Sequence, residues 1–173
     1  MKSKITLAKS VLGALGTPPL PNTAKVVLKT VALTGLAFSW GFAKGRINRR
    51  SVPKHARRQL PVKPMDVFGA ALEEEVMYRA GVNRVIGPVS GAVLFGLGHF
   101  SNDPKESALG KVFRVADAAM GGALYEHVYT TALGEAPTGL AMIGAILRGL
   151  AASTAAHTAH NIGVRVGLSG KSR

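Results

Sequence analysis

The sequence predicts an all-α protein: a compact, membrane-associated bundle of about four core helices, with one N-terminal hydrophobic helix and a short amphipathic helix. Apolar residues make up 47% of the chain, which excludes a wholly disordered protein. Runs with the alternation typical of strands are scarce. The chain has 21 Gly against 6 Phe, 3 Tyr and 1 Trp, and small residues at this density suit close contact between helices, as in membranes.

Charge divides the chain into a basic leader and a neutral body. Residues 1–65 contain 13 basic residues and no acidic one, whereas residues 66–173 contain nine of each. We therefore expect a leader over residues 1–65, a helical core over 66–167 and a basic tail over 168–173. The absence of cysteine excludes a disulfide framework, a thiolate zinc site and a cysteine nucleophile.

Two helices are expected in the leader. Residues 1–16 place apolar side chains at helical spacing among lysines, which predicts either an amphipathic helix on a membrane surface or a short surface helix. The prolines of segment 17–22 end it. Residues 26–43 are almost entirely apolar. As a helix this segment would be about 27 Å long, close to the thickness of the hydrocarbon core of a bilayer.

Residues 44–63 are expected to form a basic loop, because they contain eight basic residues and no acidic one. Positive charge beside a membrane helix favours the cytoplasmic side, and it can bind anionic lipid. Nucleic acid is the competing partner, but no aromatic residues are interleaved with this charge to stack on bases. The candidate residues for an anionic partner are Arg46, Arg49, Arg50, Lys54, Arg57 and Arg58.

The body is expected to contain four helices, over about residues 65–81, 85–100, 107–132 and 138–167. Gly87-Pro88 predicts the break between the first two, and Pro137 the break before the last. Two acidic residues of the third helix, Asp117 and Glu126, are candidates to neutralise Arg148.

The first of three ionisable clusters in the body is Glu73-Glu74-Glu75 with Arg79. An ionisable group on a membrane helix is costly and is therefore a functional candidate. Glu75 and Arg79 are four residues apart and can pair, which leaves Glu74 as the candidate general base. Taken alone, the cluster is better explained as a solvated acidic first turn that complements the helix dipole.

The other two clusters contain histidines. His99 ends an apolar run, and alone it would be a buried or interfacial histidine. His157 and Asn161 lie four residues apart on one helix face, which a polar surface would also explain. Together, the clusters can converge in one pocket, where a Glu and a His activate water and the remaining His and Asn stabilise an oxyanion.

A metal site is the other reading of these residues. The zinc signature HExxH is absent from the sequence. Even so, Glu74, His99 and His157 are residue types that could bind a divalent metal such as zinc. No other cofactor is indicated.

The three clusters resemble the motifs of the CPBP family (CAAX protease and bacteriocin-processing, also called ABI), which are intramembrane glutamic endopeptidases. The family pattern is EExxxR, then FxxxH, then HxxxN on successive core helices. In this chain the pattern reads, in order, Glu74-Glu75 to Arg79, Phe95 to His99, and His157 to Asn161.

The resemblance covers about residues 66–167 and implies peptide-bond hydrolysis within a membrane. The roles that it implies are water activation by Glu74 with His99, a structural pair of Glu75 and Arg79, packing near the site by Phe95, and oxyanion stabilisation by His157 and Asn161.

The alternative hypothesis is a catalytically silent protein of the same fold, whose basic leader anchors it to a membrane, to nucleic acid or to a large assembly such as a virion. The expected partners are a peptide or protein substrate and an anionic lipid membrane, with nucleic acid or a large assembly as alternatives. We expect the protein in or on a membrane, with residues 44–63 on the cytoplasmic side, or alternatively within a large particle.

Overall fold

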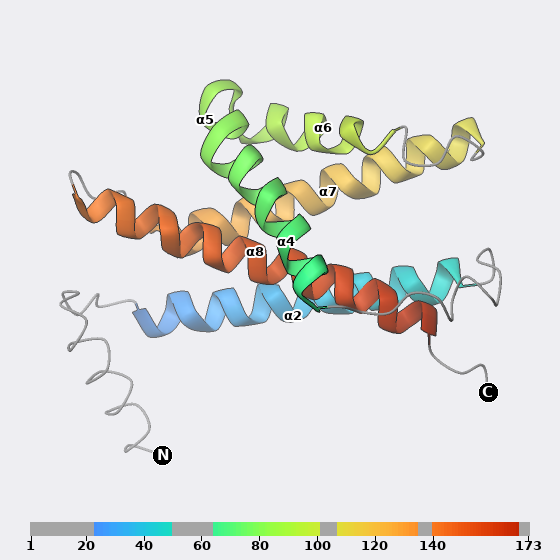
Figure 1. The fold of residues 1–173 in the computed structure, drawn as a ribbon, viewed down its shortest axis with the longest axis horizontal. Coiled ribbons are helices and arrows are strands. Elements are labelled where there is room, and N and C mark those ends of the chain that lie inside the picture. The colour runs from blue at the N-terminus through green and yellow to red at the C-terminus, as the bar shows by residue number, and fades with distance from the viewer. Residues whose placement is uncertain (1–22, 50–63, 101–106, 135–139, 170–173) are drawn as a thin grey trace, which may run out of the picture.

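The computed structural model describes residues 23–49, 64–100, 107–134 and 140–169, and these residues form helices and no strand (Figure 1). The predicted all-α fold is therefore confirmed. The amphipathic helix expected over residues 1–16 lies outside the described residues. The elements are α2 (Thr23–Asn48), α4 (Pro64–Glu75), the π-helix η1 (Val76–Val82), α5 (Asn83–Ile86), α6 (Pro88–Gly98), α7 (Ala108–Leu133) and α8 (Leu140–Ser169).

The hydrophobic helix α2 is longer than the predicted segment 26–43. It begins at Thr23 and ends at Asn48, so the first five residues of the expected basic loop are helical. The reason is that no proline interrupts them and that Gly45 is buried against α8. By length and composition, α2 is the one helix in the described ranges that could cross a membrane.

The helix predicted over residues 65–81 is a chain of three segments, α4, η1 and α5, which ends at Ile86. Gly87 then adopts a φ of 85° and Pro88 starts α6. The break predicted at Gly87-Pro88 is confirmed, because glycine tolerates a positive φ and proline suits the first turn of a helix. The predicted start of the next helix at residue 85 is wrong, since the preceding helical segment continues through Ile86.

The last two helices lie close to their predicted ranges. At the start of α7, the Ser107 hydroxyl accepts a hydrogen bond of 3.1 Å from the backbone N–H of Gly110, which satisfies one of the free donors of the first turn. Gly134, with a φ of 71°, ends α7. α8 begins at Leu140 and ends at Ser169, two residues later at each end than the predicted 138–167.

Helices α2 and α8 pack in parallel along one another, in the most extensive helix contact of the described structure (Figure 1). Gly41 of α2 faces the backbone of His160, and one turn further on Gly45 faces that of Val164. A Cβ at either glycine would lie closer than 3.0 Å to a carbonyl oxygen of α8, so only glycine permits this approach. The boundary expected near residue 65 therefore does not separate α2 from the core.

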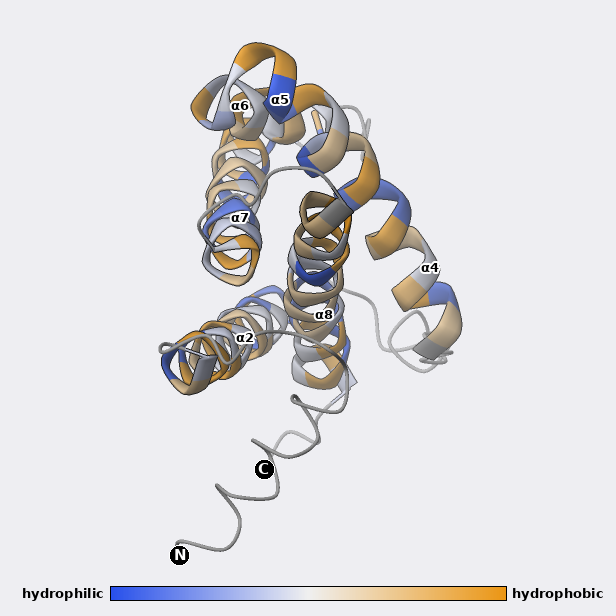
Figure 2. Ribbon diagram, turned by 90° about the vertical axis from the view of Figure 1, so that its left-hand side faces the viewer, coloured by the Kyte–Doolittle hydropathy of each residue, from blue (hydrophilic) through white to orange (hydrophobic). Residues whose placement is uncertain are grey.

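Helix α7 runs antiparallel to α2 and α8 and completes the central group of three. Ala37 of α2, Tyr125 and Val128 of α7, and Ala156 of α8 form a buried apolar cluster. Figure 2 shows the three helices nearly end-on, with α4 on the flank of α8 away from α2 and with α6 beside α7. The chain thus brings α4, η1, α7 and α8 together around one interior.

Polar and apolar side chains are distributed unusually in this bundle. Glu75 and Arg79 are fully buried, whereas Val89, Val93 and Leu97 of α6 are exposed. Other large apolar side chains are exposed on α2, α4, α7 and α8, and apolar segments are visible on α4, α5 and α6 (Figure 2). Exposed apolar surface of this extent is typical of surfaces that contact lipid or other proteins.

Candidate active site

A buried ion pair lies at the boundary where α4 ends and the π-helix η1 begins. Arg79 Nε donates to Glu75 Oε2 at 3.0 Å, and neither side chain is exposed to solvent. The predicted pairing of Glu75 with Arg79 is therefore confirmed. π-helical turns are rare in proteins, but those that occur are often found at functional sites. Here the wider turn brings Arg79 and Asn83 to the bundle interior, where both are buried.

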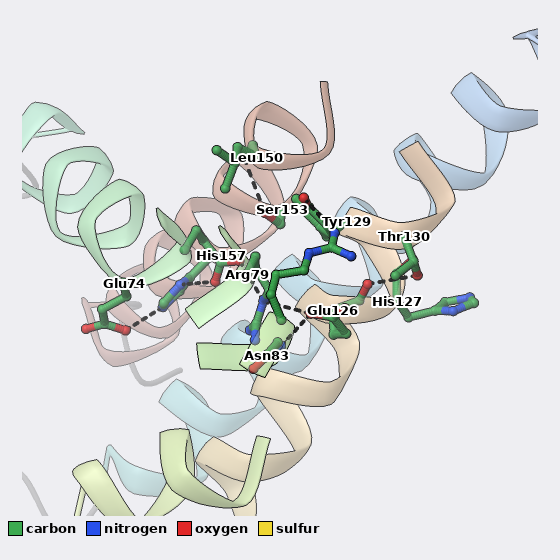
Figure 3. Close-up of polar contacts among 12 residues, drawn as sticks. Glu74, Arg79, Asn83, Glu126, His127, Tyr129, Thr130, Leu150, Ser153 and His157 are labelled. Atoms are coloured by element: carbon green, nitrogen blue, oxygen red, sulfur yellow. Dashed lines mark hydrogen bonds and ion pairs between the residues drawn. The ribbon is translucent and has the colours of Figure 1, made fainter. Parts of the chain in front are cut away.

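His157 of α8 contacts two adjacent glutamates of α4, and Figure 3 shows its ring beside Glu74. Its Nδ1 is 3.0 Å from Glu75 Oε1, and its Nε2 is 3.6 Å from Glu74 Oε2. A carboxylate only accepts hydrogen bonds, so the short contact assigns a proton to Nδ1, which donates to Glu75. Nε2 then faces Glu74, and it is an acceptor in the neutral Nδ1–H tautomer and a donor in the protonated ring.

The oxygen of Glu74 that faces His157 has an unfilled hydrogen-bonding position. Glu74 Oε2 is buried and has no hydrogen-bond partner among the described residues. With His157 neutral, two acceptors face one another across 3.6 Å, an arrangement that calls for a proton donor. A water molecule or a substrate N–H could donate there, and protonation of His157 would also satisfy both atoms.

Aromatic rings hold His157 in place. Tyr125 of α7 stacks on the imidazole with a centroid distance of 4.5 Å and an interplanar angle of 16°. Phe95 of α6 meets the same ring edge-on at 5.9 Å. Phe95 also contacts Tyr78 at 5.0 Å and His99 at 4.9 Å. Phe95 therefore packs against one residue of each motif.

His99 and Asn161 make no direct polar contact with Glu74, Glu75 or His157 among the described residues. His99 Nδ1 is 2.8 Å from the carbonyl oxygen of Phe95, and since a carbonyl only accepts, Nδ1 carries a proton. No ion pair joins His99 to Glu74 in the described structure. Asn161 is half-buried and makes no polar contact with a described residue. Direct contacts thus unite Glu74, Glu75 and His157, while His99 reaches them through Phe95.

A carboxylate of α7 completes the polar interior. Glu126 Oε2 is 3.7 Å from Arg79 Nε and accepts a hydrogen bond of 2.5 Å from Asn83 Nδ2. The sequence offered Glu126 and Asp117 as partners of Arg148, but Glu126 lies against Arg79 and Asp117 pairs with Lys44 of α2. Both contacts join residues more than 40 positions apart in the chain, so no local spacing could have predicted them.

The expected metal ligands do not form a metal site in the described residues. Within these residues there is no group of three His, Cys, Asp or Glu side chains with a geometry that could hold a metal ion. Glu74 and His157 are close to one another, but His99 is held against the Phe95 backbone instead.

Part of the predicted anion-binding cluster is described. Arg46 is exposed in the last turn of α2, and Arg49 follows the end of that helix. Arg50, Lys54, Arg57 and Arg58 lie outside the described residues.

Comparisons with protein-family models, with curated proteins and with solved structures gave no match for this chain.

Proposed function

We propose that the protein is a membrane-associated endopeptidase of the CPBP type, in which Glu74 activates a water molecule. The observation that carries the proposal is the buried Glu74 Oε2, which has no hydrogen-bond partner among the described residues and lies 3.6 Å from His157 Nε2. Glu75 fixes the ring from the opposite side at 3.0 Å. A side chain held in one orientation by a buried partner is what proton transfer requires.

In the proposed reaction, the oxygen of the water attacks the carbonyl carbon of a peptide bond. Glu74 accepts one proton of that water and then delivers it to the departing amine nitrogen as the C–N bond breaks. His99 assists Glu74 through Nε2, because its Nδ1 is engaged by the carbonyl oxygen of Phe95. The oxyanion is stabilised by the side-chain amide of Asn161 and by the Nε2–H of His157 in its protonated form, since the two residues lie one turn apart on α8.

The decisive experiment compares two neighbouring carboxylates. Glu74→Gln keeps the size of the side chain but removes the base, so cleavage of an internally quenched peptide by purified protein in liposomes should fall by about 100-fold or more. Glu73 is exposed on the same helix and makes no contact in the site, so Glu73→Gln is the matched control. Wild-type rates in Glu74→Gln, or loss of activity in both variants, would refute the proposed role of Glu74.

The proposed location is a membrane that α2 crosses, with the basic segment from Lys44 onward on the cytoplasmic side. The apolar residues exposed along α2 support it, as does Arg46 at the end of the same helix. Flotation with vesicles of phosphatidylserine and phosphatidylcholine, compared with salt-dependent retention on DNA, tests the anionic partner. Retention on DNA without flotation would favour nucleic acid instead.

The alternative function is a catalytically silent anchor of the same fold. The observation that favours it is the absence of any polar contact of Asn161 with the described residues. A silent protein would give identical peptide cleavage in wild type and Glu74→Gln while still binding anionic vesicles through its leader.

A further inference from the structure

We infer that Glu126 is a positioning residue of the site: it shares Arg79 with Glu75 and thereby keeps Glu75 available to hold His157. None of the three sequence motifs contains Glu126. The inference rests on the proposed peptidase function, and it adds a fourth helix, α7, to a site that the motifs place on α4, α6 and α8.

The geometry at Arg79 carries the first step. A single nitrogen, Arg79 Nε, lies 3.0 Å from Glu75 Oε2 and 3.7 Å from Glu126 Oε2. Two carboxylates therefore share the single positive charge of one guanidinium, whose Nη1 and Nη2 have no hydrogen-bond partner among the described residues. Arg79 and Glu75 are fully buried, and the Glu126 side chain is 13% exposed. Charges interact strongly at such distances when water is excluded.

The second step follows from the charge balance. Arg79 cannot fully neutralise both carboxylates, so Glu75 keeps negative charge on Oε1, the oxygen that accepts from His157 Nδ1. A hydrogen bond to a charged acceptor is stronger than one to a neutral group. Without the charge of Glu126, Arg79 would serve Glu75 alone, and the Glu75 to His157 hydrogen bond would weaken.

Asn83 and Gly91 hold Glu126 in place. Asn83 Nδ2 donates to Glu126 Oε2 at 2.5 Å, and the Asn83 amide lies directly over Gly91 of α6. A Cβ at Gly91 would overlap the Asn83 amide oxygen and lie 2.6 Å from its Cγ. Gly91→Ala therefore displaces the amide and leaves every charged group of the network present.

The ring nitrogens of His157 provide the test, because their ¹⁵N chemical shifts report the tautomer without any need for catalysis. We expect Glu126→Gln to move the shifts away from the Nδ1–H tautomer, and Gly91→Ala to move them in the same direction. Glu73→Gln should leave them unchanged, and Glu126→Asp, which keeps the charge, should stay closer to wild type than Glu126→Gln. Unchanged His157 shifts in both Glu126→Gln and Gly91→Ala would overturn the inference.

Kinetics separate positioning from substrate binding. For Glu126→Gln we expect kcat to fall by about 2- to 30-fold, the range seen for residues that act through a network, with KM unchanged. A rise in KM with an unchanged kcat would overturn the inference, since Glu126 would then act on substrate affinity. If wild-type protein cleaves no peptide but the His157 shifts respond to Glu126→Gln, the peptidase proposal fails and the positioning role stands.

Discussion

The close contact of α2 with α8 makes the effect of an added methyl group predictable. Gly41 and Gly35 are both glycines of α2, but only Gly41 faces α8. A Cβ at Gly41 would lie 2.9 Å from the carbonyl carbon of His160 and 3.1 Å from its Cα, whereas a Cβ at Gly35 would have no neighbour within 4 Å. Because the atoms facing Gly41 belong to the backbone, no side-chain rotation can relieve the overlap.

The two variants should therefore shift stability in opposite directions. Gly35→Ala should raise the free energy of unfolding by about 0.5–1 kcal/mol, since alanine is the better helix former. Gly41→Ala gains the same preference but forces the helices apart, and overpacking of this kind costs about 1–3 kcal/mol. A difference of about 1–3 kcal/mol between the two variants, with Gly41→Ala the less stable, is the expected result.

Denaturant titration in detergent, followed by circular dichroism at 222 nm, measures this difference. The matched pair cancels effects of helix preference and of the detergent. Equal midpoints for the two variants, or a Gly41→Ala protein at least as stable as Gly35→Ala, would show that α2 does not pack on α8 through Gly41.

The remaining predictions concern the free energy of unfolding, and the size of each effect follows from how buried the altered contact is. Glu75→Ala removes the hydrogen-bonded partner of the fully buried Arg79 and leaves it only Glu126 at 3.7 Å, so it should lower the free energy of unfolding by about 3–5 kcal/mol. A loss below about 1 kcal/mol in the denaturant titration would contradict the burial of the pair. Asp117→Asn breaks a partly exposed pair with Lys44 and should cost less than about 1 kcal/mol, which the same titration checks. Ser107→Ala removes the cap of α7 and should cost about 1 kcal/mol; Ser107→Thr, which keeps the hydroxyl, should stay near wild type.

The spacing of residues along the chain was sufficient to predict an ion pair within one helix and a break between two helices. The Glu75 to Arg79 pair needs only four-residue spacing, and the break at Gly87-Pro88 needs only the backbone preferences of two residues. The π-helix η1 could not be predicted in this way, because Val76–Val82 carries no proline or other signal that distinguishes it from an α-helix. Its cause is tertiary: both Arg79 and Asn83 find partners in the interior.

Contacts between helices that are far apart in the chain could not be predicted from the sequence. The role of Glu126 depends on α7 packing beside η1, and that of Tyr125 on α7 packing beside α8. The spacing of His157 and Asn161 predicted a shared helix face, but it could not predict which acid would reach His157 Nδ1. The structure gives that place to Glu75, the glutamate that the motif analysis had assigned to the arginine alone.

The parallel course of α2 and α8 has a consequence for sidedness. Residue 49 and residue 169 leave the bundle at the same end, because Gly41 and Gly45 meet His160 and Val164 in the same order. If α2 crosses a bilayer, the chain between α2 and α8 must therefore return to the side on which α2 begins, because α8 begins on that side too. The sequence has no cysteine, so single cysteines introduced next to these two residues would react with an impermeant thiol reagent from the same side.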